Sequence, residues 1–245
     1  MRRLLLLLLL LCPVPAWAQA TFSQFAVDAA GSPFTGDGID DLSFGSTVAS
    51  GARVIVFFGL EATSRTVSSV TDDGGNTYAL CGATGTAETN GAWEAWAYCS
   101  KTTATMQTVT VTLSAASAAV ADFVMFAVTG DDSTANGSLP VAIGTDITGT
   151  THNSGNVTLG GDGLLVGWII GSSGTYTIDA DFTEPSGANQ SNSTGGYDDA
   201  ASGTHGFTTT TVGNEATISF LVGLVDAGGA ATCTGGVLLL GAGKC

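Results

Sequence analysis

Short segments in which apolar and polar residues alternate, or apolar residues run together, recur along the chain between Gly, Asp and Asn. None of them repeats its apolar residues with the helical period of 3.6, which leaves strands as the expected elements. We expect strands at residues 22–27, 53–60, 66–71, 77–81, 92–99, 108–114, 121–129, 163–170, 175–180 and 216–225. The pattern predicts an all-β chain with little or no helix.

The segments are of two kinds. Residues 108–114 alternate strictly, which directs Val109, Val111 and Leu113 to a core and the threonine hydroxyls to solvent. Residues 53–58 and 164–170 are apolar at nearly every position, as in strands covered on both faces. We therefore expect these two segments in the middle of the core.

Turn residues separate the expected strands. Residues 72–76 (Asp-Asp-Gly-Gly-Asn) lie between two of them and predict a hairpin. The chain has no Pro-rich linker, and its later half loosely repeats the earlier one, with an apolar strand, a Thr-rich strand, a Gly/Asn loop and a closing apolar strand. We expect one domain over residues 19–227, a two-sheet antiparallel jelly-roll sandwich.

The first 18 residues have the pattern of a signal peptide. Arg2 and Arg3 precede a run of leucines, and Ala16-Trp17-Ala18 fits a signal-peptidase site, with cleavage after Ala18. The run is shorter than the roughly 20 residues that span a bilayer, so no membrane span is expected. The alternative is a lipoprotein anchored at Cys12, but Leu11 occupies the preceding position, where such an anchor requires a small residue. We expect a secreted or cell-surface protein.

Charge narrows the choice of partners. The chain has 21 acidic and 6 basic residues, for a formal net charge of −15. Nucleic acids and anionic lipid surfaces would be repelled. Removal of the signal peptide would leave four basic residues (Arg53, Arg65, Lys101 and Lys244) against all 21 acidic ones. This excess of negative charge favours cations as partners.

Four cysteines remain after residue 18, an even number that predicts two disulfides in an exported chain. We favour Cys81 with Cys99, because each follows an aromatic β segment. Cys233 and Cys245 would then clamp a tail formed by residues 228–245. A zinc site is the alternative, but the chain has no Cys-x-x-Cys pair and only two histidines.

Four segments in a fixed order carry a family resemblance: residues 66–78, the Trp96-Ala97-Tyr98 strand, residues 108–112, and residues 126–131. Residues 161–166 (Gly-Asp-Gly-Leu-Leu-Val) add a fifth. Together the set resembles an uncharacterised jelly-roll module of secreted bacterial and phage-associated proteins, over roughly residues 22–225. The resemblance implies a lectin-like sandwich and an exported setting, and no catalytic set.

Paired aspartates in Gly/Asn-rich turns are candidate calcium ligands, because Ca²⁺ takes six to eight oxygens from carboxylates and turned-in carbonyls. Asp72 with Asp73 and Asp131 with Asp132 are the pairs that we select. The alternative is ordinary turn chemistry, which also places aspartate between strands. Both interpretations stay open at this point, and Ca²⁺ is the one cofactor considered.

Aromatic residues beside polar loops suggest a platform that stacks on sugar rings. Trp93 and Tyr197 are the candidates, with Asn90 and Asp198 as neighbouring polar groups. The alternative is that these rings pack inside the fold.

Evidence for catalysis is weak. Asp179, Asp181 and Glu184 resemble the carboxylate strand of jelly-roll glycosidases only in part, because Glu184 has the opposite parity. No Gly-x-Ser-x-Gly elbow is present, and His152 and His205 lie in polar segments where an exposed histidine is expected. We identify no catalytic residue.

These observations predict an exported, non-catalytic β-sandwich for binding or adhesion, with glycan as the leading ligand class. One alternative is a structural subunit of a surface or virion type that assembles with copies of itself. Another is a jelly-roll carbohydrate-active enzyme.

Overall fold

A computed structural model describes residues 18–28, 38–61, 65–82, 86–87, 93–115, 121–132, 134–146, 148–172 and 174–228. Most of the expected signal peptide, Asn90, Cys233 and Cys245 lie outside these residues. The described chain is almost entirely antiparallel β-structure, and its helical element is the single 3-10 turn η1 (Asn136–Ser138). The prediction of an all-β antiparallel sandwich is confirmed.

The first half of the chain forms two sheets. Their strands are β1 (Thr21–Val27), β2 (Ile39–Val48), β3 (Arg53–Leu60), β4 (Val67–Asp72), β5 (Ala79–Leu80), β6 (Thr86–Ala87), β7 (Glu94–Lys101), β8 (Met106–Leu113) and β9 (Ala121–Thr129). The inner sheet has the order β1-β9-β3-β7-β5, with β6 also paired to β7, and the outer sheet has the order β2-β8-β4.

The second half forms two further sheets. Their strands are β10 (Val141–Asp146), β11 (Thr151–Leu159), β12 (Gly163–Gly171), β13 (Tyr176–Ile178), β14 (Ser193–Ala200), β15 (Gly203–Thr211) and β16 (Thr217–Val225). The inner sheet of this half has the order β10-β16-β12-β14, and the outer sheet has the order β11-β15-β13.

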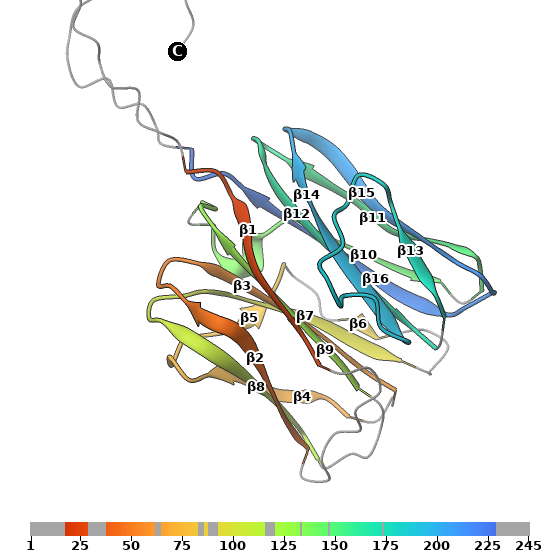
Figure 1. Ribbon diagram of the computed structural model, residues 1–245, viewed down its shortest axis with the longest axis horizontal. Coiled ribbons are helices and arrows are strands. Elements are labelled where there is room, and N and C mark those ends of the chain that lie inside the picture. The colour runs from red at the N-terminus through yellow and green to blue at the C-terminus, as the bar shows by residue number, and fades with distance from the viewer. Residues whose placement is uncertain are drawn as a thin grey trace, which may run out of the picture.

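The two halves have the same topology. Replacing β1, β2, β3, β4, β7, β8 and β9 by β10 to β16, in that order, converts the sheets of the first half into those of the second. In each half, the order of the strands in the two sheets is that of an eight-stranded jelly roll that lacks one strand. The repeat noticed in the sequence is therefore structural: where one two-sheet sandwich was expected, the chain forms two, each of two sheets (Figure 1).

The four sheets stack in layers and enclose three cores. One core lies within each sandwich, and the third lies between the two inner sheets. Every residue of β3 and β12 is buried, because each strand has a core on both faces. The prediction that these two segments form the middle of the core is confirmed.

The central core shows how the repeats face each other. Phe57 of β3 and Trp168 of β12 stack with ring centroids 5.4 Å apart. Each lies in an interior strand of its inner sheet, so β3 and β12 face each other across the central core. Gly59 also faces this core, where a side chain would collide with Ile170.

The strand ends of the two halves join at one end of the molecule. Asp131, after β9, forms an antiparallel bridge with Asp226, after β16. The Ala227 amide donates to the Gly130 carbonyl at 2.9 Å, and Ala18 forms a further bridge with Ala227. Both ends of the described fold therefore leave it at the same place.

Residues 72–76 do not form the expected hairpin. β4 pairs with β8 in the outer sheet, whereas β5 pairs with β7 in the inner sheet. The turn carries the chain from one sheet to the other, and Asp72 holds it by accepting the Gly74 amide at 3.0 Å and the Tyr78 hydroxyl at 3.0 Å. The turn residues were recognised correctly, but the strand pairing was not.

The disulfide between Cys81 and Cys99 is confirmed, and it attaches the end of short β5 to β7. We expect the Cys81→Ser/Cys99→Ser double variant to lose about 3 kcal/mol of unfolding free energy, because the bond closes a loop of medium length. Denaturant titration measures the loss. Thiol labelling of Cys81 in the unfolded, unreduced mature protein would contradict the pairing.

Candidate binding site

A cavity of about 240 Å³ opens where the two sandwiches meet, at the end where β1 and β12 begin. We call it the seam cavity. It is lined by Gln19, Ala20, Thr21, Asp162, Gly163, Asp199, Ala200, Ala201 and Asp226. Three carboxylates and no basic side chain are among these described residues, so the cavity is suited to hydroxyl groups or cations.

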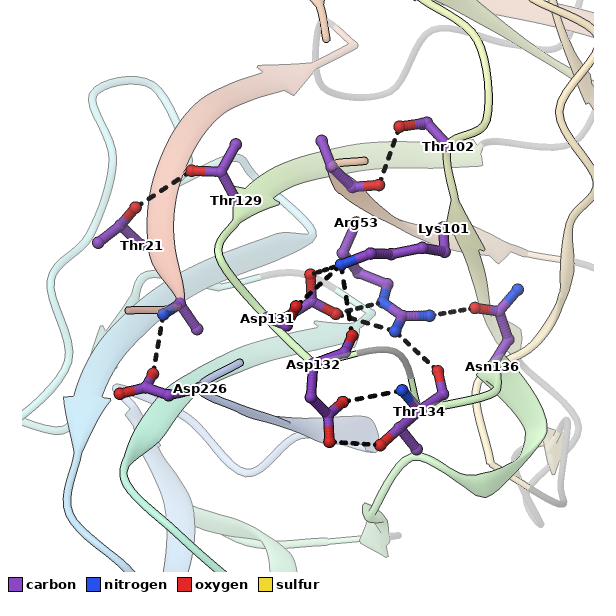
Figure 2. Close-up of polar contacts among 12 residues, drawn as sticks. Thr21, Arg53, Lys101, Thr102, Thr129, Asp131, Asp132, Thr134, Asn136 and Asp226 are labelled. Atoms are coloured by element: carbon purple, nitrogen blue, oxygen red, sulfur yellow. Dashed lines mark hydrogen bonds and ion pairs between the residues drawn. The ribbon is translucent and has the colours of Figure 1, made fainter. Parts of the chain in front are cut away.

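Short polar contacts fix two of the three aspartates. Asp226 accepts the Ala20 amide at 2.8 Å and so holds the chain where it enters β1 (Figure 2). Asp162 accepts the Ser202 amide at 3.0 Å. Asp199 is exposed and lies on the same face of β14 as Tyr197, which directs it to the seam.

An aromatic pair adjoins the cavity. The rings of Phe22 in β1 and Tyr197 in β14 are stacked, with centroids 4.2 Å apart and planes 8° from parallel. Both are half-buried, and Phe22 contacts Phe126 edge to face at 6.4 Å. We call Phe22 and Tyr197 the aromatic ledge. It joins the edge strands of the two inner sheets beside the three carboxylates.

The four residues predicted to bind a ligand do not form one site. Trp93 is 1% exposed and packs in the central core, so the prediction that it forms a surface platform is wrong. Asp198 lies on the opposite face of β14 from Tyr197, where burial, and then Asp181, raise its pKa. Asn90 lies outside the described residues. Tyr197 alone of the four lies at the seam.

The first predicted calcium pair has its oxygens engaged within the chain. Asp72 accepts from Gly74, Asn76 and Tyr78. Asp73 accepts the Gln107 amide at 2.8 Å, and this hydrogen bond lowers its pKa. Both carboxylates hold turns, and the geometry does not support a calcium site there.

The second pair, Asp131 and Asp132, also has other partners. Asp131 is fully buried and pairs with Arg53, Nη2 to Oδ2, at 2.8 Å, and also with Lys101 (Figure 2). Asp132 accepts the Thr134 amide at 2.9 Å. Across the described residues, no three His, Cys, Asp or Glu side chains are grouped to hold a metal ion.

The ion cluster of Arg53, Lys101 and Asp131 was not predicted from the sequence. Arg53 is fully buried, donates to the Thr134 carbonyl at 2.8 Å and also contacts the Asn136 side chain. An arginine at the start of a wholly apolar strand was the available signal, because a buried guanidinium needs an acidic partner. Two of the four basic residues after residue 18 thus share one aspartate.

The candidate glycosidase carboxylates do not form a strand face. β13 ends at Ile178, and Asp179 lies in a turn in which it accepts the Asp181 amide at 3.3 Å. Glu184 accepts the Thr194 hydroxyl. The alternation proposed from the sequence therefore does not apply to these acids.

His152 is buried rather than exposed as expected. It lies in β11, where its Nε2 is 3.1 Å from the Thr211 hydroxyl and its Nδ1 is 3.0 Å from that of Thr217. Burial lowers its pKa, and the neighbouring Asp146 acts in the opposite direction. These contacts give it a structural role. His205 hydrogen-bonds to the Ala201 carbonyl at 2.8 Å.

Comparisons with known proteins give no further guidance: no family model matches the sequence, and no similar curated protein or solved structure was found. The resemblance to the secreted jelly-roll module stays a prediction. In the described residues, no helix is long and apolar enough to cross a membrane.

Proposed function

We propose that this protein is exported and binds extracellular glycan, without catalysis, at the seam cavity and the aromatic ledge. The observation that carries the proposal is the stacked pair of Phe22 and Tyr197 beside three aspartates in one cavity. Aromatic faces stack on the apolar faces of sugar rings, and carboxylates accept hydrogen bonds from sugar hydroxyls. The cavity is smaller than the roughly 300–1,000 Å³ of drug-sized pockets, so it suits one sugar unit.

Binding of the mature protein, from Gln19 onward, to a broad glycan array tests this proposal. We expect saturable, sugar-specific binding, which Asp199→Asn weakens about tenfold because a charge-assisted hydrogen bond is lost. Asp41→Asn is the matched control, since Asp41 lies on the exposed face of β2 and contacts Thr110 at 2.5 Å. Repeating the array with calcium and with a chelator tests whether the binding depends on Ca²⁺. If no glycan binds under either condition, the proposal fails.

A second candidate function, assembly with copies of itself, is favoured by β1. This strand ends the order of its inner sheet, and none of the described strands pairs with its outer edge. Phe22, Phe25 and Val27 on it are only half-buried. An open, partly apolar edge is a template for pairing with another chain. Sedimentation at rising protein concentration tests this function, and a monomer at every concentration would rule it out.

A further inference from the structure

Two neighbouring loops close one end of the second sandwich. Residues 148–150 lie between β10 and β11, and residues 212–216 connect β15 to β16. Two main-chain hydrogen bonds of 2.9 Å join the loops, one from the Thr211 amide to the Thr150 carbonyl and one from the Glu215 amide to the Gly149 carbonyl. We call the two loops, joined in this way, the loop pair.

The loop pair lies away from the proposed binding site. Thr217, which follows the second loop, pairs with Gly171 at the end of β12. The seam cavity contains Gly163, at the beginning of the same strand. The two places lie at opposite ends of β12, so a property of the loop pair is separate from glycan binding.

His152 holds both ends of the second loop. Its side chain is buried, and its Nε2 atom lies 3.1 Å from the hydroxyl of Thr211, just before the loop. Its Nδ1 atom lies 3.0 Å from the hydroxyl of Thr217, just after the loop. One buried ring therefore connects the two residues between which this loop begins and ends.

The hydroxyl of Thr211 determines where the ring carries its proton. A hydroxyl has a single proton, and that of Thr211 is donated to the Gly213 carbonyl at 2.7 Å. Thr211 must therefore accept from His152, which places the ring proton on Nε2. A neutral imidazole has no second proton, so Nδ1 accepts from the hydroxyl of Thr217. The hydrogen bonds around the second loop thus require a neutral His152.

A carboxylate lies beside the same Nδ1 atom. Asp146 is the last residue of β10 and the cross-strand partner of Thr217, and its Oδ2 is 3.4 Å from Nδ1 of His152. An unprotonated Nδ1 has no proton to donate to this carboxylate. A protonated Nδ1 can no longer accept from Thr217, but it can donate a charge-assisted hydrogen bond to Asp146. The protonation state of His152 therefore selects between two partners.

Burial opposes protonation of His152 in the folded protein. It lowers the pKa of this side chain, whereas Asp146 of β10 and, more weakly, Glu215 of the second loop act in the opposite direction. β15 and β16 present hydroxyl groups to the ring, and the sequence has no Lys or Arg between residues 102 and 243 that could compete for Asp146. Because the unfolded chain binds the proton more readily, the stability that neutral His152 provides is present above its ordinary pKa of 6.5 and is lost as the pH falls below it.

We infer that His152 is a proton-sensitive latch and that its protonation opens the loop pair. The neutral ring holds Thr211 and Thr217 together. The imidazolium donates instead to Asp146 and leaves the buried hydroxyl of Thr217 without its acceptor. The loop pair then keeps only its main-chain hydrogen bonds and opens more readily in acid.

Hydrogen exchange of the full mature protein between pH 5 and pH 7.5 tests the latch. Protection factors, which correct for the pH dependence of the intrinsic exchange rate, are measured for the amides of Thr211 and Glu215 that join the loops. We expect both to fall about tenfold towards pH 5, because the hydroxyl of Thr217 loses its acceptor. Amides of β3, in the first sandwich, are the internal reference and should not lose protection in parallel.

Variants identify the group that titrates. His152→Gln cannot be protonated, so the two protection factors should no longer depend on pH. His205→Gln is the matched control, since it replaces the second histidine of the chain, which hydrogen-bonds to the Ala201 carbonyl, and it should leave the pH dependence unchanged. Asp146→Asn alters a partly exposed side chain and keeps the test available if His152→Gln does not fold. It should move the opening to lower pH, because the imidazolium loses a favourable charge.

Three results would overturn the latch. The first is a loop pair whose protection factors do not change between pH 5 and pH 7.5. The second is an unchanged pH dependence in His152→Gln, or an opening that moves to higher pH in Asp146→Asn, since either would assign the titration to a carboxylate. The third is a set of imidazole nitrogen NMR shifts that place the proton of neutral His152 on Nδ1 rather than on Nε2.

Discussion

Asp131→Asn should lower the unfolding free energy by about 3–5 kcal/mol, the usual cost of leaving one member of a buried ion pair without its partner. Arg53 and Asp131 are both fully buried, so water cannot replace the lost carboxylate charge. Lys101 loses the same partner but is partly exposed and contributes less. Urea denaturation at neutral pH measures the change.

Two further variants test whether the loss of stability comes from the buried ion pair. Asp132→Asn, at the next residue, should cost about 1 kcal/mol or less, because Asp132 only holds a turn at Thr134. Arg53→Leu combined with Asp131→Asn should recover part of the loss, since Leu164 occupies the corresponding place in the second half. A double variant as unstable as the sum of both single variants would contradict the buried-pair explanation.

Asp122→Asn should have the opposite effect and stabilise the protein at neutral and higher pH. Asp122 is 1% exposed, and neither of its carboxylate oxygens has a hydrogen-bond partner within the described part of the chain. Burial, and then the charge of Asp28, raise its pKa to about 7 from an ordinary value of 3.8. Asparagine keeps the shape of the side chain without the charge, so we expect a gain of about 4 kcal/mol above pH 7, from about three pKa units.

The pH dependence of this gain follows from the direction of the shift. Well below the ordinary pKa of 3.8, Asp122 is protonated in both the folded and the unfolded state, and the substitution should change little. As the pH rises from about 4 to about 7, the unfolded state ionises first, which lowers the stability of the original protein but not of the variant. Thermal denaturation from pH 4 to 8 measures the difference. Asp41→Asn, on an exposed strand face, is the control, and a gain independent of pH would contradict the assignment.

Strands with strong apolar patterns were predictable from the sequence. β3 and β9 have the bounds that alternation and apolar runs indicated, and β12 differs by one residue. β10 was missed, and so were β2, β11, β14 and β15, in which Ser, Thr, Asn, Asp and Gly occupy most of the positions. β14 shows why such residues suit a strand: side chains at Gly195 and Gly196 would crowd Phe126 and Ile178. The β propensity of a residue type does not reflect such packing constraints, so these strands could not be recognised from the sequence.

The candidate site was predictable only at Tyr197. Its cavity is built from residues far apart in the chain, such as Gln19, Asp162 and Asp226, which come together because two sandwiches pack through their inner sheets. The repeat was visible in the sequence as a loose similarity between the strand patterns of the two halves. That each half forms its own sandwich depends on which strands pair, and the sequence pattern does not determine this. The misassigned hairpin at residues 72–76 shows that turn chemistry alone does not determine pairing.

The bridge between Ala18 and Ala227 bears on how the fold would respond to mechanical force. A load applied between the two ends of the described fold acts first on this bridge and on the Asp226 contact to Ala20. Among the described strands β1 pairs only with β9, so its ladder of hydrogen bonds would then open from Thr21 onward, one residue pair at a time. The stacked sheets behind it lie outside the line of force, and the aromatic ledge would separate before either sandwich opens.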